Sequence, residues 1–215
     1  AMTGETLVRH ESFWSEKMNT QVINPSLSIH DDGLLEGGMS SGSRDGEGVP
    51  RRQQALVEDG RLTGMLWSTR DAAQQVAEGR IDGAQSTGSA TSGGHQSPPS
   101  TGCTELFLTS TQPAQSTDQL LERMGDGYIV NSVMGAHTAN PSSGDFSVTT
   151  SSILKVEGGE IVGALKQAGL SGNLAKALNG PVVLGQEVRR QGSYSSGSMH
   201  LPDVLLMDGL RINPA

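Results

Sequence analysis

The sequence predicts an α+β fold made mainly of antiparallel β-sheet, with hairpins and a few short helices. Aromatic residues make up only 3% of the 215 residues and hydrophobic residues 34%, so the core must be aliphatic. The 29 glycines, with abundant Ser and Thr, favour turns and short strands over a helical bundle. Hairpin turns are prominent, and helix and strand patterns alternate irregularly. This length predicts one domain or two small ones.

Residues 1–20 are predicted to be a lead-in to the domain. Ala1-Met2 has the form of an expression scar, and residues 11–19 predict a short helix with Phe13, Trp14 and Met18 on one side. Residues 21–215 form the predicted domain. Its first strand has Leu27 and Ile29 in alternation, and residues 36–50 are rich in Gly and Ser and predict a loop.

Two hairpins follow from turn chemistry. Asp59-Gly60 separates apolar residues 55–58 from 61–66, and Gly158-Gly159 separates 156–157 from 160–163. A two-residue turn of this kind needs positive φ at both centres, so we expect it at Gly60 and Gly159. The two hairpins resemble each other either through internal duplication or, as we favour, through shared turn chemistry.

The remaining elements are predicted from periodicity and end signals. Residues 70–78 predict a helix that Gly79 ends. Residues 82–104 predict a flexible Ser/Gly-rich loop, and a loop this long is either functional or disordered. A capping box at 116–119 opens a helix with Leu120, Leu121 and Met124 inward. We expect another helix at 171–179 and strands at 106–108, 128–133, 182–184 and 204–206.

Charge and composition narrow the function classes. A net charge of −8 disfavours binding to nucleic acid, because the chain would repel phosphate. No run of 18 apolar residues predicts a membrane span, and no secretory signal is visible. Cys103 is the single cysteine, which excludes an internal disulfide and is compatible with a cytoplasmic location.

The search for catalytic motifs finds none. The five histidines lack the i, i+4 spacing of a metal-binding helix, so we expect no metal site in this chain. Cys103 is expected to be a small apolar residue at a loop-to-strand junction. The acidic residues at 31, 32, 45 and 47 are expected to be solvated turns rather than a cation site. The small-residue turn at 137–141 fits close approach by another chain and an ordinary tight loop equally well.

Several separated motifs resemble the carboxy-terminal region of the TldD/PmbA family. The segment GAHTANPSSGDFSV at 135–148 begins the match, and residues 27–66, including the DGEGVP turn, are also similar. Ser86-Thr87-Gly88 resembles the start of the family's glycine-rich loop. The resemblance spans roughly residues 20–212, and its later motifs are VEGGEIVG at 156–163, LSGNLAKAL at 170–178 and PVVLGQEVR at 181–189.

The resemblance implies a larger protein with an amino-terminal α/β domain of about the same size. TldD proteins carry a His-Glu-x-x-x-His zinc helix and a late Cys ligand. Ser196 stands at the corresponding late position here, which places the chain with the non-catalytic PmbA (TldE-like) members. Such members pair with a TldD subunit, and the complex cleaves unfolded peptides in a cavity. We therefore expect no cofactor here and zinc on a TldD-type partner.

The resulting expectation is a non-catalytic subunit domain, inactive alone, that holds an extended peptide beside a TldD-type subunit or a second copy. It has no expected catalytic residue. The alternatives are a purely structural oligomerisation module and a self-standing hydrolase of unknown type. The expected peptide-lining residues are Gly135, His137, Thr138, Asn140, Gly144, Asp145, Ser86, Thr87 and Gly88.

Overall fold

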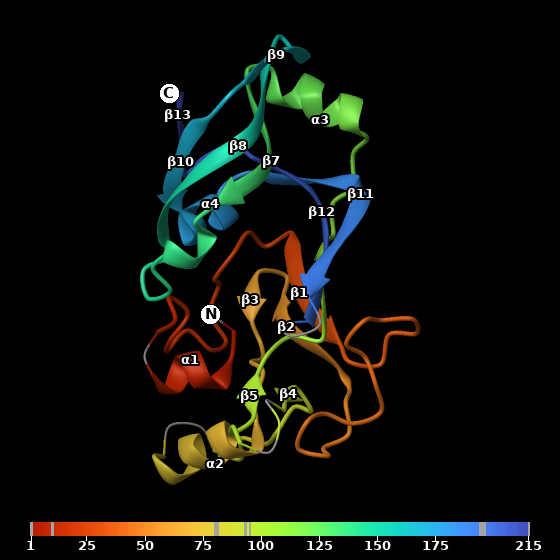
Figure 1. Cartoon of the computed structure of the whole chain (residues 1–215), viewed down its shortest axis with the longest axis vertical. Helices are drawn as coiled ribbons and strands as arrows, with labels where there is room; N and C mark the ends of the chain where they lie inside the picture. The colour runs from red at the N-terminus through yellow and green to blue at the C-terminus, as the bar shows by residue number, and fades with distance from the viewer. Residues whose placement is uncertain are drawn as a thin grey trace.

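Two β-sheets, one above the other in Figure 1, organise the chain. The computed structural model describes residues 2–9, 11–79, 82–92, 94, 96–193 and 197–214. The lower sheet has six strands in the order β11-β12-β6-β1-β2-β3. Their bounds are Leu27–Asp32 for β1, Gln53–Glu58 for β2, Arg61–Leu62 for β3, Glu105–Ser110 for β6, Val182–Ser193 for β11 and Gly197–Leu206 for β12.

The upper sheet is built around one long strand, β8. Its order is β13-β10-β8-β7, and β9 also pairs with β8. Both β9 and β10 run antiparallel to β8, β9 beside its second half and β10 beside its first half. The bounds are Gly127–Met134 for β7, Asp145–Glu157 for β8, Glu160–Leu165 for β9, Ala168–Asn173 for β10 and Leu210–Pro214 for β13. The long strands β11 and β12 run between the two parts (Figure 1).

The fold class is therefore α+β with mainly antiparallel sheet, as predicted. Among the described strand pairs, β12 with β6 is the parallel one. The described residues also form four short α-helices and one 3-10 turn: α1 Gly4–Val8, α2 Thr69–Ala77, α3 Thr117–Met124, η1 Ala136–Thr138 and α4 Leu174–Asn179. In the part of the chain that the structure describes, no helix is long and apolar enough to cross a bilayer.

Local end signals identified α2, α3 and both hairpins. Ser116 accepts from the backbone N–H of Gln119 and the Gln119 side chain accepts from the N–H of Ser116, which is the predicted capping box. Gly60 has φ +75° and Gly159 has φ +82°, as the turns require. These predictions are confirmed because each depends on residues that are neighbours in sequence.

Two local predictions are wrong. Residues 11–19 form turns instead of a helix, since Glu16 and Asn19 have positive φ and the N–H of Phe13 donates to the carbonyl of Pro141 at 2.9 Å. Residues 171–173 belong to β10, which pairs with β8 and β13 on its two sides, so the helix starts only after Asn173. The described residues of segment 82–104 are mostly loop, and they include the short strand pair β4 (Ala90–Thr91) and β5 (Ser100–Thr101).

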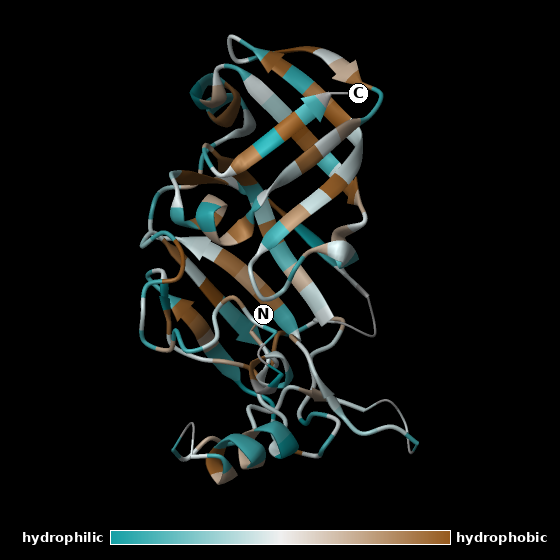
Figure 2. Ribbon diagram, turned by 90° about the vertical axis from the view of Figure 1, so that its left-hand side faces the viewer, coloured by the Kyte–Doolittle hydropathy of each residue, from teal (hydrophilic) through white to brown (hydrophobic). Residues whose placement is uncertain are grey.

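The main aliphatic core lies against one face of the six-stranded sheet. Along β1, Leu27, Ile29 and Asp31 are buried and the residues between them are half-buried. Apolar and polar bands also alternate along the upper strands in Figure 2. At the β11–β12 end, a second small cluster of Leu120, Val183 and Leu205 is buried as well. The buried members of the main core are Trp14, Val22, Ile23, Leu27, Ile29, Leu56, Val57, Leu62, Leu66, Val182 and Leu184.

Candidate functional site

The predicted peptide-lining segment 135–145 is the connection from β7 to β8. Gly135 has φ +86° and starts η1, which leaves His137, Thr138 and Asn140 exposed. The Asn140 side chain accepts from the backbone N–H of Ser142 at 2.9 Å, which closes the turn. This segment is therefore a well-bonded surface turn that presents polar side chains and backbone to solvent.

The end of this segment is attached to α4. Gly144 is buried, and its carbonyl accepts from the N–H of Leu174 at 2.8 Å. The Asn173 amide donates to Asp145 Oδ1 at 2.7 Å, and Ser143 Oγ donates to Asp145 Oδ2 at 2.7 Å. These bonds hold the pKa of the exposed Asp145 carboxyl below its ordinary value. The residue that caps α4 therefore also fixes the exit of the turn.

The second predicted segment, Ser86 to Gly88, lies in the lower part of the molecule. Thr87 exchanges bonds with Trp67: its Oγ1 accepts from the Trp67 N–H at 2.8 Å, and its N–H donates to the Trp67 carbonyl at 3.1 Å. Gly88 is buried with φ +73°. The Arg52 guanidinium donates to the carbonyl of Ser86 at 2.9 Å. Segment 86–88 is thus held by hydrogen bonds to Trp67 and Arg52. Segment 135–145, in contrast, lies against Phe13 and α4.

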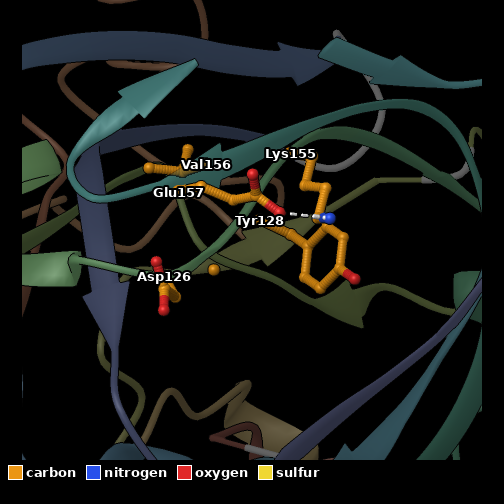
Figure 3. Close-up of a pocket in the computed structure, with 6 residues that line it drawn as sticks. Asp126, Tyr128, Lys155, Val156 and Glu157 are labelled. Carbon is orange, nitrogen blue, oxygen red and sulfur yellow. Dashed lines mark ion pairs between the residues drawn. The ribbon is translucent and has the colours of Figure 1, made fainter. Parts of the chain in front are cut away.

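A shallow cavity of about 340 Å³ lies at the opposite end of β7 from the 135–145 turn. Figure 3 shows Asp126, Tyr128, Lys155 and Glu157 around it. Lys155 Nζ lies 2.5 Å from Glu157 Oε1, and both side chains are about half exposed, so this ion pair contributes little to stability. Asp126 Oδ1 accepts from the Gly158 N–H at 2.8 Å, which ties the cavity to the β8–β9 turn.

A buried cluster of polar side chains is centred on the Glu105 carboxylate, and no sequence motif predicted it. The Glu105 side chain has an exposed fraction of 0%. Its Oε1 accepts from the backbone N–H of Ser40 at 2.9 Å, and its Oε2 lies 2.8 Å from His200 Nε2. The Arg190 guanidinium is 3.5 Å from Oε1. One carboxylate therefore joins β6 to β11, to β12 and to the 33–43 loop.

The pKa of Glu105 reflects this bonding. Burial opposes ionisation, but the Ser40 N–H, the His200 ring and the Arg190 charge together hold the pKa below its ordinary value of 4.5. The pKa of the neighbouring Asp31 is shifted in the opposite direction, above its ordinary value. Its burial raises the pKa, although it accepts from the backbone N–H groups of Thr104 and Glu105 at 2.7 and 3.0 Å.

Two of the four acidic residues at 31, 32, 45 and 47 are buried, and Cys103 lies near one of them, Asp31. The prediction of solvated turns is wrong for Asp31, which is 1% exposed, and for Asp45, which is 8% exposed and bonds the backbone of Glu47, Val49 and Ala90. Cys103 lies between β5 and β6 and packs against the main core. Burial, with Asp31 close by, raises the pKa of its thiol to about 11, so the thiol is protonated at neutral pH.

The chemistry available to the Glu105 cluster is structural. A general base must reach its substrate, and Glu105 is covered on every side. Within the described ranges, no three His, Cys, Asp or Glu side chains gather closely enough to hold a metal ion. The described residues therefore supply no ligand set for zinc. His10, His95 and Ser196 lie outside the described residues, so the expectation that Ser196 replaces a Cys ligand stays a prediction.

The whole sequence matches one protein family. Residues 1–212 match the PmbA/TldA metallopeptidase C-terminal domain. The chain belongs to the PmbA/TldD metallopeptidase family. It is 30% identical over 200 residues to the uncharacterized protein MJ0231 of Methanocaldococcus jannaschii, covering 93% of this chain and 44% of that protein. It is 27% identical over 213 residues to the metalloprotease PmbA homolog of Haemophilus influenzae, covering 99% of this chain and 42% of that protein.

Solved structures of the family share this fold. A protein described as a modulator of a DNA gyrase from Thermotoga maritima superposes with a TM-score of 0.79 at 28% identity, covering 100% of this chain and 45% of that chain. TldE from Thermococcus kodakarensis superposes with a TM-score of 0.82 at 23% identity, covering 99% of this chain and 45% of that chain. The chain therefore spans less than half the length of the relatives it matches.

Proposed function

We propose that this chain is the carboxy-terminal domain of a non-catalytic PmbA-type subunit that holds an extended, unfolded peptide for a zinc-bearing TldD-type partner. Membership of the metallopeptidase family supports the general role.

The observation that carries the proposal is the free edge of β7. Among the described strands, β7 pairs with β8 alone. Its last four residues, 131–134, are all exposed, and Val133 and Met134 expose 40% and 54% of their surface. A strand edge offers backbone N–H and C=O groups to an extended peptide whatever its sequence. Exposed apolar side chains on that edge add affinity for an unfolded chain.

The length of β7 and the features at its two ends also support peptide binding. The eight residues of β7 span about 26 Å, at roughly 3.3 Å per residue. They run from the Tyr128 cavity to the predicted turn at 135–145, so a peptide along this edge would contact both. Ladder irregularities between Val130 and Val133 interrupt the pairing with β8. Bulges of this kind twist an edge and limit unselective pairing, so we expect short peptide segments to bind.

Reconstitution tests this proposal. A TldD-type partner is combined with the full-length parent protein carrying Met134→Lys, because a lysine on a strand edge opposes strand addition. Hydrolysis of an unfolded peptide should fall with the partner's zinc still bound. The control is Ile161→Lys on β9, which changes a side chain of similar exposure, 50%, away from the β7 edge. Replacing 137–140 with bulkier residues should also lower hydrolysis, through loss of substrate orientation.

The same experiment separates the alternatives. Hydrolysis by the chain alone would favour the self-standing hydrolase and refute our proposal. Equal hydrolysis with Met134→Lys and Ile161→Lys would exclude the β7 edge. Stable assembly with the partner, or of two copies, that changes neither peptide binding nor hydrolysis would favour the purely structural module.

A further inference from the structure

Three planar rings from three neighbouring strands stack in a row on the half-exposed face of the six-stranded sheet. The rings are His30 of β1, Phe107 of β6 and His200 of β12. The centroids of His30 and Phe107 are 4.9 Å apart with planes 5° apart, and those of Phe107 and His200 are 4.2 Å apart with planes 11° apart. Strand register places these three residues directly opposite one another, so ring spacing follows strand spacing.

The row is closed at one end and open at the other. At the β12 end, the cross-strand neighbour of His200 is Arg190 of β11, which also reaches Glu105. At the β1 end, the neighbour of His30 is Ala55 of β2, whose exposed methyl group cannot cover a ring. A shallow cavity of about 370 Å³ lies there, lined by His30, Gln53, Gln54 and Ala55. The ring face of His30 that points away from Phe107 is directed toward this cavity.

The polar groups beside the cavity define the chemistry of the occupant. Asp32 and Gln53 form the next cross-strand pair on the same face. Gln53 Nε2 donates to Asp32 Oδ2 at 3.1 Å, so the carbonyl oxygen of this amide is the group left to accept. Asp32 Oδ1 accepts from the Leu34 N–H at 2.9 Å. Both bonds come from neutral donors, so the Asp32 charge is not neutralised by them.

We propose that this cavity binds the guanidinium group of an arginine side chain, which stacks on His30 above Ala55 and donates to Asp32 and Gln53. A guanidinium is planar, cationic and donor-only, and it stacks on aromatic faces, so it matches both the ring and the acceptors. Burial lowers the pKa of His30, although Asp32 opposes that shift, so the ring is neutral at pH 7 and does not repel a cation. The proposal rests on the proposed function, since the arginine would belong to an unfolded peptide substrate, in a segment other than the one along β7, because His30 lies on the six-stranded sheet.

The test uses N-acetyl-argininamide as the probe and the ring signals of His30 in NMR spectra as the readout. We expect saturable shifts, with binding at least about fivefold weaker for N-acetyl-lysinamide, which lacks the plane, and for N-acetyl-citrullinamide, which lacks the charge. Ala55→Met fills the cavity and should abolish the shifts. The matched control Ala164→Met, at an exposed alanine of β9, should leave them unchanged.

A second variant keeps the test decisive if Ala55→Met unfolds the domain. Asp32→Asn preserves shape and removes charge, so it should weaken argininamide binding to the citrullinamide level. Equal binding of argininamide and citrullinamide, or binding unaffected by Ala55→Met in a folded domain, would overturn the proposal. An unfolded peptide that binds equally well with arginine or citrulline refutes this inference and leaves the proposed function intact. Binding of argininamide by a domain that binds no unfolded peptide would support this inference and refute the proposed function.

Discussion

Replacing Glu105 should destabilise the domain by an amount set by its three partners. In Glu105→Leu, the Ser40 N–H and the His200 ring lose their acceptor while still largely covered. A buried polar group left unpaired costs about 1–3 kcal/mol, and breaking a buried ion pair costs about 3–5 kcal/mol in total. We therefore expect a loss of about 3–5 kcal/mol, or roughly 6–20 °C in the melting temperature for a chain of this size.

Glu105→Gln removes the charge of the side chain and keeps its shape. The amide oxygen can still accept from Ser40, and the amide nitrogen can donate to a neutral His200. What is lost is the extra strength of bonds to a charged acceptor, about 1–2 kcal/mol. The control is Glu58→Gln, an exposed glutamate on β2, which should change stability by less than about 0.5 kcal/mol. Denaturant unfolding at pH 7 measures all three variants.

The pH dependence gives a second check on the same residue. The folded pKa of Glu105 lies below its ordinary 4.5, so its charge adds stability at pH values above 4.5. That contribution is lost as the pH falls through the folded pKa. The stability difference between the wild type and Glu105→Gln should therefore shrink below pH 4.5. A difference that stays constant into acid, or a Glu105→Leu variant as stable as Glu58→Gln, would refute the reasoning.

Three further predictions concern a turn, a thiol and a metal. Gly60→Val should lower the free energy of unfolding by about 1–3 kcal/mol more than Gly158→Val does. Both glycines have positive φ, but an added Cβ meets Gln21 and the backbone of Ile23 only at Gly60. Equal denaturation midpoints for the two variants would contradict this. Cys103 should react slowly with a thiol reagent at pH 8, since a pKa of about 11 leaves roughly one thiolate in a thousand. If the folded protein reacted as fast as the protein unfolded in urea, burial would not protect this thiol. The isolated chain should hold no stoichiometric zinc, and elemental analysis finding about one tightly held zinc per chain would disprove this.

Part of the candidate site could be predicted from the sequence, and part of it is seen only in the tertiary structure. The 135–145 turn was predicted to line a peptide from its small residues and family resemblance; it follows the exposed end of β7, and its contact with a peptide stays a prediction. The Glu105 cluster and the His30 ring row carried no sequence signal, because Glu105 and His200 are 95 residues apart. A single glutamate before an apolar strand is indistinguishable from a surface residue until its neighbours are known.

The sequence by itself determined the features that depend on neighbouring residues. Asp59-Gly60 and Gly158-Gly159 specify their turns because glycine adopts positive φ without strain, and Ser116 with Gln119 starts α3 through bonds three residues apart. These features also fixed the fold class, since hairpins predict antiparallel sheet.

Only the tertiary structure decided where distant strands meet. Residues 171–173 were predicted to begin a helix, yet they pair with β8 and β13 as part of β10, and Asn173 caps the helix that follows. Phe13 forms its backbone bond with Pro141 rather than within a helix. Backbone groups that are buried must find partners, and a partner supplied by a distant strand can outweigh a local propensity of less than about 1 kcal/mol per residue.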